Sequence, residues 1–217
     1  MPKSLGPGKR IDPRFELNLS MALRETPEAA DFVHSIHGQI FVHHDQDESE
    51  QIAGYIRASL LQLGEALEHG LSADQLGDGI SGDIADYWEL LFDVETGMWK
   101  DELQSEFEID RTDLLIIDCI ELQHPLRGLG VGLLSVERFI EIFGAGCGLV
   151  ACKPWPLQFT PAFAANPQKL EQLRPPGTDL ETSVRKLRTY WSKAGFWPVG
   201  NSGIYVMSTS QRNGSHT

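Results

Sequence analysis

The chain has 217 residues, 41% of them hydrophobic and 23% charged, which is enough apolar material for one domain with a buried core. Its 31 acidic residues against 18 Lys and Arg give a net charge of −13, which argues against a general nucleic-acid binder because phosphates repel such a surface. No apolar run reaches the roughly 18 to 20 residues that span a bilayer. No apolar segment typical of a secretory signal follows the N-terminus. We therefore expect a cytoplasmic protein that binds neither nucleic acid nor membrane.

The cysteines and histidines do not suggest a metal centre. The chain has an odd number of cysteines, without the spacing of metal ligands: Cys119, Cys147 and Cys152. This pattern indicates reduced intracellular thiols packed as small core residues. The adjacent His43 and His44 have no cluster of Cys, Asp or Glu at ligand spacing, and neighbours on a strand point to opposite faces. We expect no metal site.

The charge is distributed unevenly along the chain. Residues 1–110 carry 7 basic and 23 acidic side chains, a net charge of −16, whereas residues 111–217 carry 11 basic and 8 acidic ones, a net charge of +3. One interpretation is a protein that brings a phosphate-bearing cofactor to a cationic partner. The other is a set of solvated acidic loops that maintain solubility.

The first part of the chain predicts three strands and one short helix. Alternating apolar residues predict a half-buried strand over 15–21. A Thr-Pro pair before an apolar segment predicts a helix over about 26–38. Strands follow over 39–43 and 51–60, and the polar residues 45–50 between them predict a hairpin turn.

The segment of about 64–110 is acidic, punctuated by glycine and helical in its spacing, which predicts a helical insertion. Ser81 or Asp83 is the expected cap of its clearest helix. Aromatic side chains in this segment suit ordinary helix packing, or, beside carboxylates, the receipt of a cationic amine. The residues concerned are Ile84, Tyr87, Trp88, Leu91 and Phe92 on one helix face, then Trp99, with Asp83, Asp86 and Glu89 as the carboxylates.

The second part alternates strands with helices. We expect strands over 113–122, 146–152 and 204–207, helices over 130–143 and from Thr178 or Asp179 to about 194, and a proline-bearing loop over 153–177 that could carry specificity. This mixture predicts an α+β or α/β domain.

The segment from Leu122 to Leu134 carries the strongest chemical signal. Its glycines allow a tight turn with outward-pointing amides, and the helix that follows adds a partial positive charge, which together make a phosphate cradle. Arg127 supplies a permanent cation. A dinucleotide fingerprint is excluded because Leu133 stands where its last glycine belongs, and a nucleoside-triphosphate P-loop is excluded because no Gly-Lys-Ser or Gly-Lys-Thr occurs.

The pattern Arg127-x-x-Gly130-x-Gly132 resembles the [RQ]-x-x-G-x-[GA] motif of the GNAT superfamily of acyl-CoA N-acyltransferases. A second element, Tyr190 to Phe196, resembles the helix that ends in Gly-Phe in that family. The resemblance covers roughly residues 113–207. The distance between the two elements is about 20 residues longer than in the family, and the proline-bearing loop accounts for the excess.

The resemblance implies a single α+β domain over 1–217, with the insertion at about 64–110 and the loop at about 153–177. Its mixed, mostly antiparallel sheet would be flanked by helices and splayed between the fourth and fifth strands, where acyl-CoA lies. Acetyl-CoA or another acyl-CoA would be the co-substrate. The backbone at Leu122 and Gln123 would contact the pantetheine arm, and the pyrophosphate would be held by Arg127, Gly128, Leu129, Gly130, Val131 and Gly132.

The implied reaction is direct attack of a neutral amine on the thioester, which needs a base, a group that polarises the carbonyl and an acid for the thiolate. Trp191 stands where many members carry a tyrosine acid, and indole cannot protonate a thiolate. Tyr190 is the weaker substitute, about 100° away around the helix. Glu121 is the first choice for the base, with Asp118 and His124 as alternatives. The alternative interpretation of Glu121 is an exposed strand carboxylate without a catalytic role.

We therefore expect an N-acetyltransferase whose acceptor is a cationic small molecule or a lysine-type amine. The sequence is also compatible with a homodimer. Two alternatives remain open: a non-catalytic acyl-CoA-binding sensor or regulatory module, which Trp191 favours, and a protein-interaction domain with a vestigial cradle.

Overall fold

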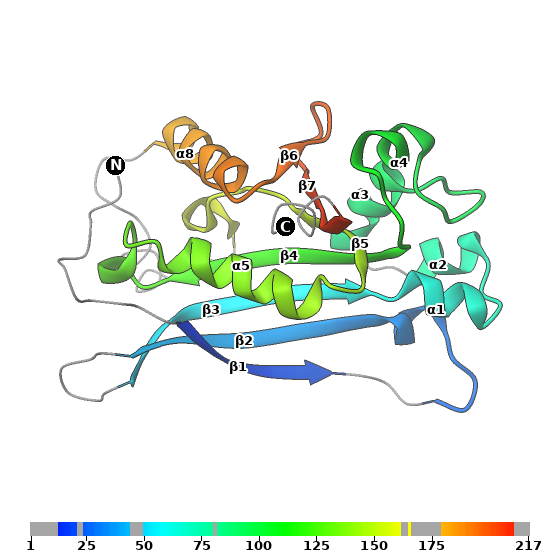
Figure 1. Cartoon of the computed structure of the whole chain (residues 1–217), viewed down its shortest axis with the longest axis horizontal. Coiled ribbons are helices and arrows are strands. Elements are labelled where there is room, and N and C mark those ends of the chain that lie inside the picture. Colours follow the sequence, from blue (N-terminus) through cyan, green and yellow to red (C-terminus); the bar gives the residue numbers. More distant parts are fainter. Residues whose placement is uncertain are drawn as a thin grey trace.

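A computed structural model describes residues 13–20, 24–43, 50–79, 82–161, 165 and 179–210. Seven strands form one open sheet in the order β1-β2-β3-β4-β5-β7-β6 (Figure 1). Only β4 and β5 run parallel, and every other neighbouring pair is antiparallel. The strands are β1 (Pro13–Ser20), β2 (Val33–His43), β3 (Glu50–Leu61), β4 (Asp113–Leu122), β5 (Cys147–Cys152), β6 (Trp197–Pro198) and β7 (Tyr205–Ser208). The predicted mixed, mostly antiparallel α+β sheet is confirmed.

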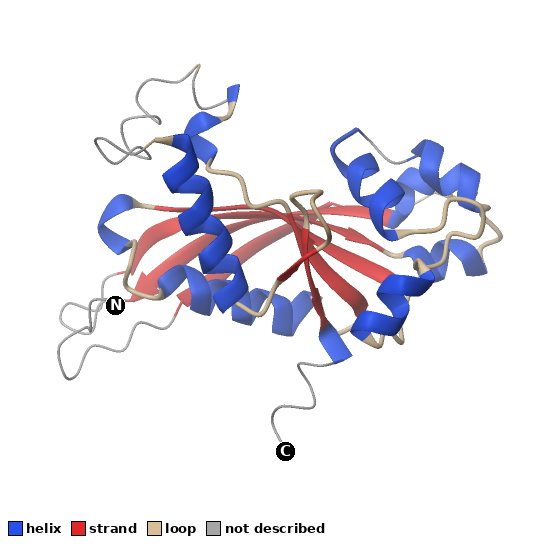
Figure 2. Cartoon of the chain, turned by 90° about the horizontal axis from the view of Figure 1, so that it is seen from above, coloured by secondary structure: helices blue, strands red, loops and turns tan. Residues whose placement is uncertain are grey.

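Helices pack against the two faces of this sheet. The short 3-10 helix η1 (Ala29–Phe32) packs on one face with α1 (Leu63–Glu68), α2 (Ala73–Gly79), α3 (Gly82–Leu91) and α4 (Asp101–Phe107). The other face carries α5 (Val131–Phe143) and α8 (Leu180–Lys193). Strand alternation divides the core between the faces, so Leu114 belongs to the first cluster and Leu115 to the second. Figure 2 shows α1–α4 gathered at one end of the sheet and α8 crossing it.

The predicted helix over 26–38 is wrong. Only Ala29–Phe32 form a helical turn, opened by a capping box between Glu28 and Asp31, and β2 begins at Val33. Burial along β2 alternates from residue to residue, which is the period of a strand with one covered face. Because β3 pairs along the whole of β2 and β1 pairs with residues 35–42, strand pairing overrides the local helical spacing.

The acidic insertion folds as the four helices α1–α4, which confirms its helical character. Its aromatic side chains form a buried stack, with ring centroids 4.9 Å apart for Trp88 and Phe92 and 4.1 Å apart for Phe92 and Trp99. The Trp99 indole donates to the carbonyl of Arg111 at 2.6 Å. These rings therefore act in packing and are not placed to receive an amine. The cap predicted at Asp83 is wrong, because that residue lies inside α3, and Ser81 is outside the described residues.

The predicted elements of the second part are found at nearly the predicted bounds. Asp179 caps α8 by accepting from the Thr182 amide at 2.7 Å, and all six residues of β5 are buried. The two-residue strand β6 was not predicted. Of the predicted turn over 45–50, Glu50 belongs to β3 and the other residues lie outside the described residues. Met21, most of the loop beyond Pro161 and the C-terminal tail lie outside them as well.

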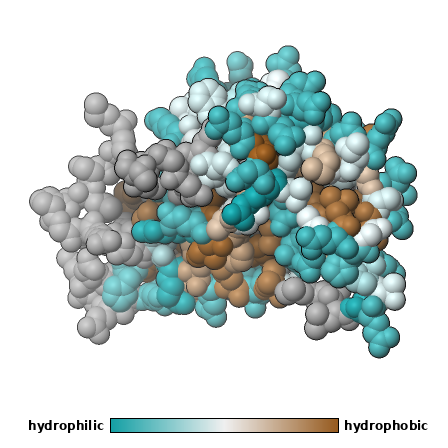
Figure 3. All heavy atoms as spheres, turned by 45° about the vertical axis from the view of Figure 1, so that its right-hand side comes forward, coloured by the Kyte–Doolittle hydropathy of each residue, from teal (hydrophilic) through white to brown (hydrophobic). Residues whose placement is uncertain are grey.

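Apolar side chains reach the surface in patches bounded by hydrophilic ones (Figure 3). Helix α5 illustrates the division between surface and core. Phe139 is fully buried and its ring centroid lies 6.1 Å from that of Phe15 on β1, whereas Ile142 is 58% exposed.

We expect Phe139→Ala to lower the free energy of unfolding by about 3 to 5 kcal/mol, because it leaves a cavity between α5 and the sheet. Ile142→Ala on the same helix should change it by no more than about 0.5 kcal/mol. Urea unfolding followed by circular dichroism measures both. Equal losses would contradict the packing of α5 described above.

Candidate functional site

The last half of β4 lacks a strand neighbour on one side. Pairing of β4 with β5 covers Asp113–Ile117 and ends where Ile117 meets Cys152. Pairing with β3 on the other side continues to Leu122. Among the described residues, no strand therefore pairs with 118–122 along the β5 edge.

Backbone groups at this unpaired edge point outward. The Gln123 amide donates to the Ala53 carbonyl at 2.8 Å, towards β3. The backbone N–H and C=O groups of successive strand residues point to alternate edges of the strand. Those of Leu122 and Ile120 therefore point away from β3, to the unpaired edge. The Leu122 carbonyl accepts there from Nε of Arg127 at 2.9 Å.

A glycine turn leads from β4 into α5. Gly128 and Gly130 have φ angles of 78° and 86°, and a Cβ at either would meet no atom within 4 Å. Gly130 caps α5 without a side-chain bond, and the first intrahelical bond runs from Leu134 N to Gly130 O at 3.1 Å. The amides of 131–133 therefore have no intrahelical acceptor and carry the positive end of the helix dipole. This arrangement suits an anion.

Arg127 braces this turn. Its side chain is half-buried and its Nε bond ties the turn to the end of β4. Burial lowers the pKa of the guanidinium, while the Glu121 carboxylate acts in the opposite direction. Arginine keeps its charge at neutral pH, so the brace also adds a cation beside the helix start.

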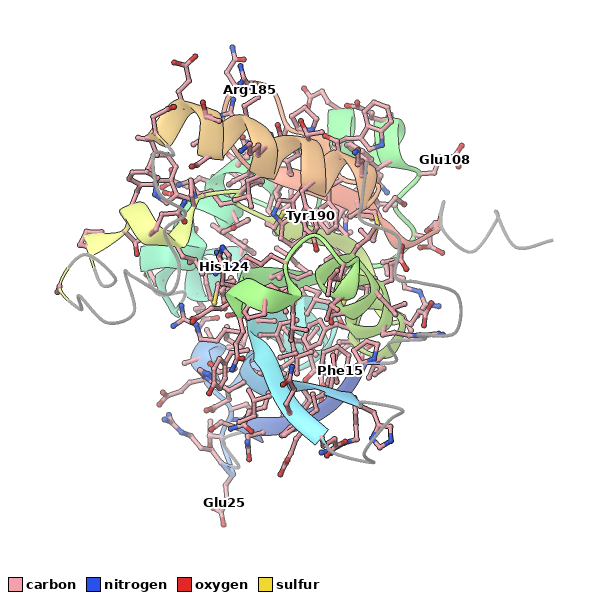
Figure 4. All side chains as sticks on the ribbon, turned by 90° about the vertical axis from the view of Figure 1, so that its left-hand side faces the viewer. Phe15, Glu25, Glu108, His124, Arg185 and Tyr190 are labelled. Atoms are coloured by element: carbon pink, nitrogen blue, oxygen red, sulfur yellow. The ribbon has the colours of Figure 1, made fainter. Side chains whose placement is uncertain are left out.

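Tyr190 reaches the same place from α8. A Cβ built on Gly132 would lie 2.8 Å from the Tyr190 hydroxyl and 2.9 Å from Cδ1 of Leu122. Gly132 therefore permits the close approach of α8 to the start of α5, as Figure 4 shows for Tyr190. Burial, with a smaller contribution from the charge of Glu137, raises the Tyr190 pKa well above its usual value.

Trp191 points elsewhere. It is 6% exposed and packs edge-on against Phe196, with ring centroids 5.0 Å apart. The position that carries a tyrosine acid in the resembling family is thus a core position here, and Tyr190 is the residue that α8 directs towards the glycine turn.

Glu121 lies on the opposite face of β4. Ile120 and Leu122 pack with α5 and α8, which places Cys119 and Glu121 on the other side, as the alternation predicted. Glu121 is partly buried and faces Tyr55 across the strand pair. Because β4 has no strand on its β5 side here, both of its faces border the same unpaired edge.

A β-bulge at Asp118 shapes this end of β4. Arg57 pairs with Cys119 and Ala58 with Ile117, so Asp118 is the extra residue. The Asp118 carboxylate accepts from the Ser59 hydroxyl at 3.1 Å, and Nε of Arg57 donates to the Cys119 sulfur at 3.2 Å.

Sequence reasoning missed Arg57, a cation that interacts with both of these acids. The Cys119 contact is the main cause of its raised pKa, and the charges of Asp118 and Glu121 act in the same direction. No local sequence signal marks Arg57, because the register between β3 and β4 determines which residues lie beside it.

His124 is exposed at the turn after β4 (Figure 4). Gln123, which precedes it, is also exposed. In the described part of the chain, no three His, Cys, Asp or Glu side chains are grouped to hold a metal ion. No described helix is both long and apolar enough to cross a membrane.

In comparisons with known proteins, no family model, curated protein or solved structure matches this chain.

The contact between Gly132 and Tyr190 predicts an energetic coupling. We expect Gly132→Ala to destabilise the wild-type protein more than it destabilises Tyr190→Phe, by at least about 0.5 kcal/mol, because removing the hydroxyl removes the closest clash. Gly130→Ala should cost the same in both backgrounds, since nothing lies near its Cβ. Urea unfolding of the two double-mutant cycles measures this. Additive behaviour of Gly132→Ala would place the hydroxyl elsewhere.

Proposed function

We propose that this protein is an acyl-CoA-dependent N-acyltransferase that transfers an acetyl group from acetyl-CoA to an amine. The observation that carries the proposal is the convergence at one place of an unpaired strand edge, a left-handed glycine turn opening a helix, and a tyrosine hydroxyl. The GNAT-like motif from Arg127 to Gly132 occupies this turn.

The proposed co-substrate extends along the end of β4. Its pantetheine amides would bond the outward backbone of Ile120 and Leu122, as strands bond at a sheet edge. Its pyrophosphate would lie at the amides of 131–133, which have no intrahelical acceptor. Arg127 adds positive charge beside them.

The proposed reaction forms one bond and breaks one. The amine nitrogen attacks the thioester carbonyl, the N–C bond forms and the C–S bond breaks. Glu121 accepts the proton that the amine loses, directly or through water, and the departing thiolate takes a hydrogen bond from Tyr190. Because its pKa is raised, Tyr190 keeps its proton at neutral pH and serves as a hydrogen-bond donor more readily than as a full proton donor.

Glu121 suits the base better than its alternatives. It makes no hydrogen bond or ion pair with any described residue, whereas Asp118 is engaged by Ser59. His124 is exposed at the turn, farther along the chain from the bulge.

The acceptor we propose is a cationic small molecule or a lysine-type amine. The net charge of −16 over residues 1–110 and the carboxylates of Asp118 and Glu121 on β4 favour an approaching cation. A non-catalytic acyl-CoA sensor is the second candidate. It is favoured by the buried Trp191 and by the raised Tyr190 pKa, which weaken the supply of a catalytic acid.

Gly130→Val should weaken acetyl-CoA binding by about tenfold or more, because a branched residue resists a φ of 86° and would displace the amides of the turn. Gly70→Val is the matched control. Gly70 has a φ of 84° and an open Cβ position, but lies between α1 and α2. Calorimetry with acetyl-CoA measures both, and equal losses would remove the turn from the binding site.

Glu121→Gln should lower kcat by about 100-fold or more while leaving acetyl-CoA affinity within about twofold, since a general base contributes to turnover and not to cofactor binding. Glu16→Gln on β1 removes a strand carboxylate far along the sheet and should leave both unchanged. Thiol release with a saturating amine measures kcat. A Glu121→Gln variant with full turnover would assign the base to another group.

A further inference from the structure

A groove lies on the face of α8 that points away from the sheet. It is open to solvent, has a volume of about 560 Å³, and is bordered by the loop that follows β5. Trp155 of that loop is 47% exposed, and Leu180 at the start of α8 is 39% exposed. Together with Val184 they form an apolar wall of the groove. Trp155 and Leu180 are too exposed to serve as core residues.

Two arginines on the groove make no hydrogen bond or ion pair with any described residue. Arg185 and Arg188 both line it. The hydrogen bonds from Thr182 are the main cause of the lowered Asp179 pKa at the helix cap, and the charge of Arg185 adds a smaller contribution. Several other described arginines of this acidic protein have side-chain partners. Examples are Arg14 with Glu50, Arg24 with Glu28, Arg57 with Cys119 and Arg138 with Glu141.

The groove is separate from the glycine turn. Arg185 and Tyr190 lie five residues apart, which places them about 140° from one another around the helix. Figure 4 shows Arg185 directed away from the sheet and Tyr190 directed towards α5. A ligand held by Arg185 therefore uses a different surface of α8.

We propose that this groove binds a phosphate-bearing planar ring, of the adenine-nucleotide class. The ring would stack on the Trp155 indole against Leu180 and Val184, and the phosphates would pair with Arg185 and Arg188. Glu181 also lines the groove, one helical turn before Arg185, so the lining keeps a net charge of +1 on a protein whose total is −13.

The size of the groove favours a small molecule over a polypeptide. Ligand pockets enclose about 300 to 1,000 Å³, and this groove falls within that range. A stable protein partner needs about 1,000 Å² or more of buried surface. The exposed indole of Trp155 suits the ring of a nucleotide, and the two guanidinium groups beside it suit the phosphates.

The test is calorimetric titration of the full chain with ATP, with adenosine and inorganic tripolyphosphate as probes of the two halves. We expect ATP to bind more tightly than either half. Arg185→Gln with Arg188→Gln should weaken ATP binding by about tenfold or more, because two charge-assisted bonds are lost. Trp155→Ala should weaken ATP binding and leave tripolyphosphate binding unchanged.

Lys186→Gln is the matched control, because it removes a positive charge from the same helix outside the groove lining. It should leave ATP affinity within about twofold. Circular dichroism verifies that each variant keeps its fold. Absence of ATP binding at about 5 mM, or an equal loss in Lys186→Gln, would overturn the proposal.

Competition identifies the source of the nucleotide. If acetyl-CoA displaces ATP from the groove, the bound group is the nucleotide end of CoA, and if both bind together it is a free nucleotide. Either result supports the groove as a nucleotide site. The proposal does not depend on the acyltransferase function: Gly130→Val tests the glycine turn, and the arginine pair tests the groove.

Discussion

The parallel pairing of β4 and β5 stops at Ile117 and Cys152, while β4 continues to Leu122 with only β3 beside it. This loss of one neighbour leaves five residues of β4 with an unshared edge in the middle of a seven-stranded sheet. A parallel connection needs a crossover, and α5 supplies it on one face. The glycine turn into α5 therefore starts where the unshared edge ends, which brings outward backbone groups and helix-start amides together.

The remaining features follow from that geometry. Gly132 lets α8 approach α5 closely, so Tyr190 reaches the helix start, while Trp191 packs into the core beside Phe196. The bulge at Asp118 sets which side chains of β4 face α5 and which face the polar side with Arg57. The helix start and the acidic residues thus lie on the two faces that border the unpaired edge of β4. An extended molecule with an anionic middle and a reactive end suits such a place, and this is the physical basis of the proposed use of acyl-CoA.

Features set by local sequence could be predicted. The glycines before α5, the apolar run of β5 and the Asp179 cap of α8 each specify their element within a few residues. The start of β2 could not be predicted, because the apolar residues around Val33 also fit a helical spacing. Pairing with neighbouring strands is what gives this segment its alternating burial.

Contacts between distant segments also escaped prediction. The bulge at Asp118 depends on the register with β3, and the placement of Arg57 depends on that bulge. The direction of Tyr190 depends on a missing Cβ about 60 residues away at Gly132. Helix geometry predicts that Tyr190 and Trp191 point about 100° apart, but it does not predict which of the two rings enters the core.

The most direct measurement is thiol release from acetyl-CoA in the presence of a panel of polyamines, aminoglycosides and lysine peptides, after binding of acetyl-CoA has been measured in the same sample. We predict that acetyl-CoA binds and that thiol release depends on an amine and saturates with its concentration. Absence of acetyl-CoA binding at about 1 mM, a concentration at which weak ligands still register, would contradict the central claim that the end of β4 and the start of α5 form an acyl-CoA site.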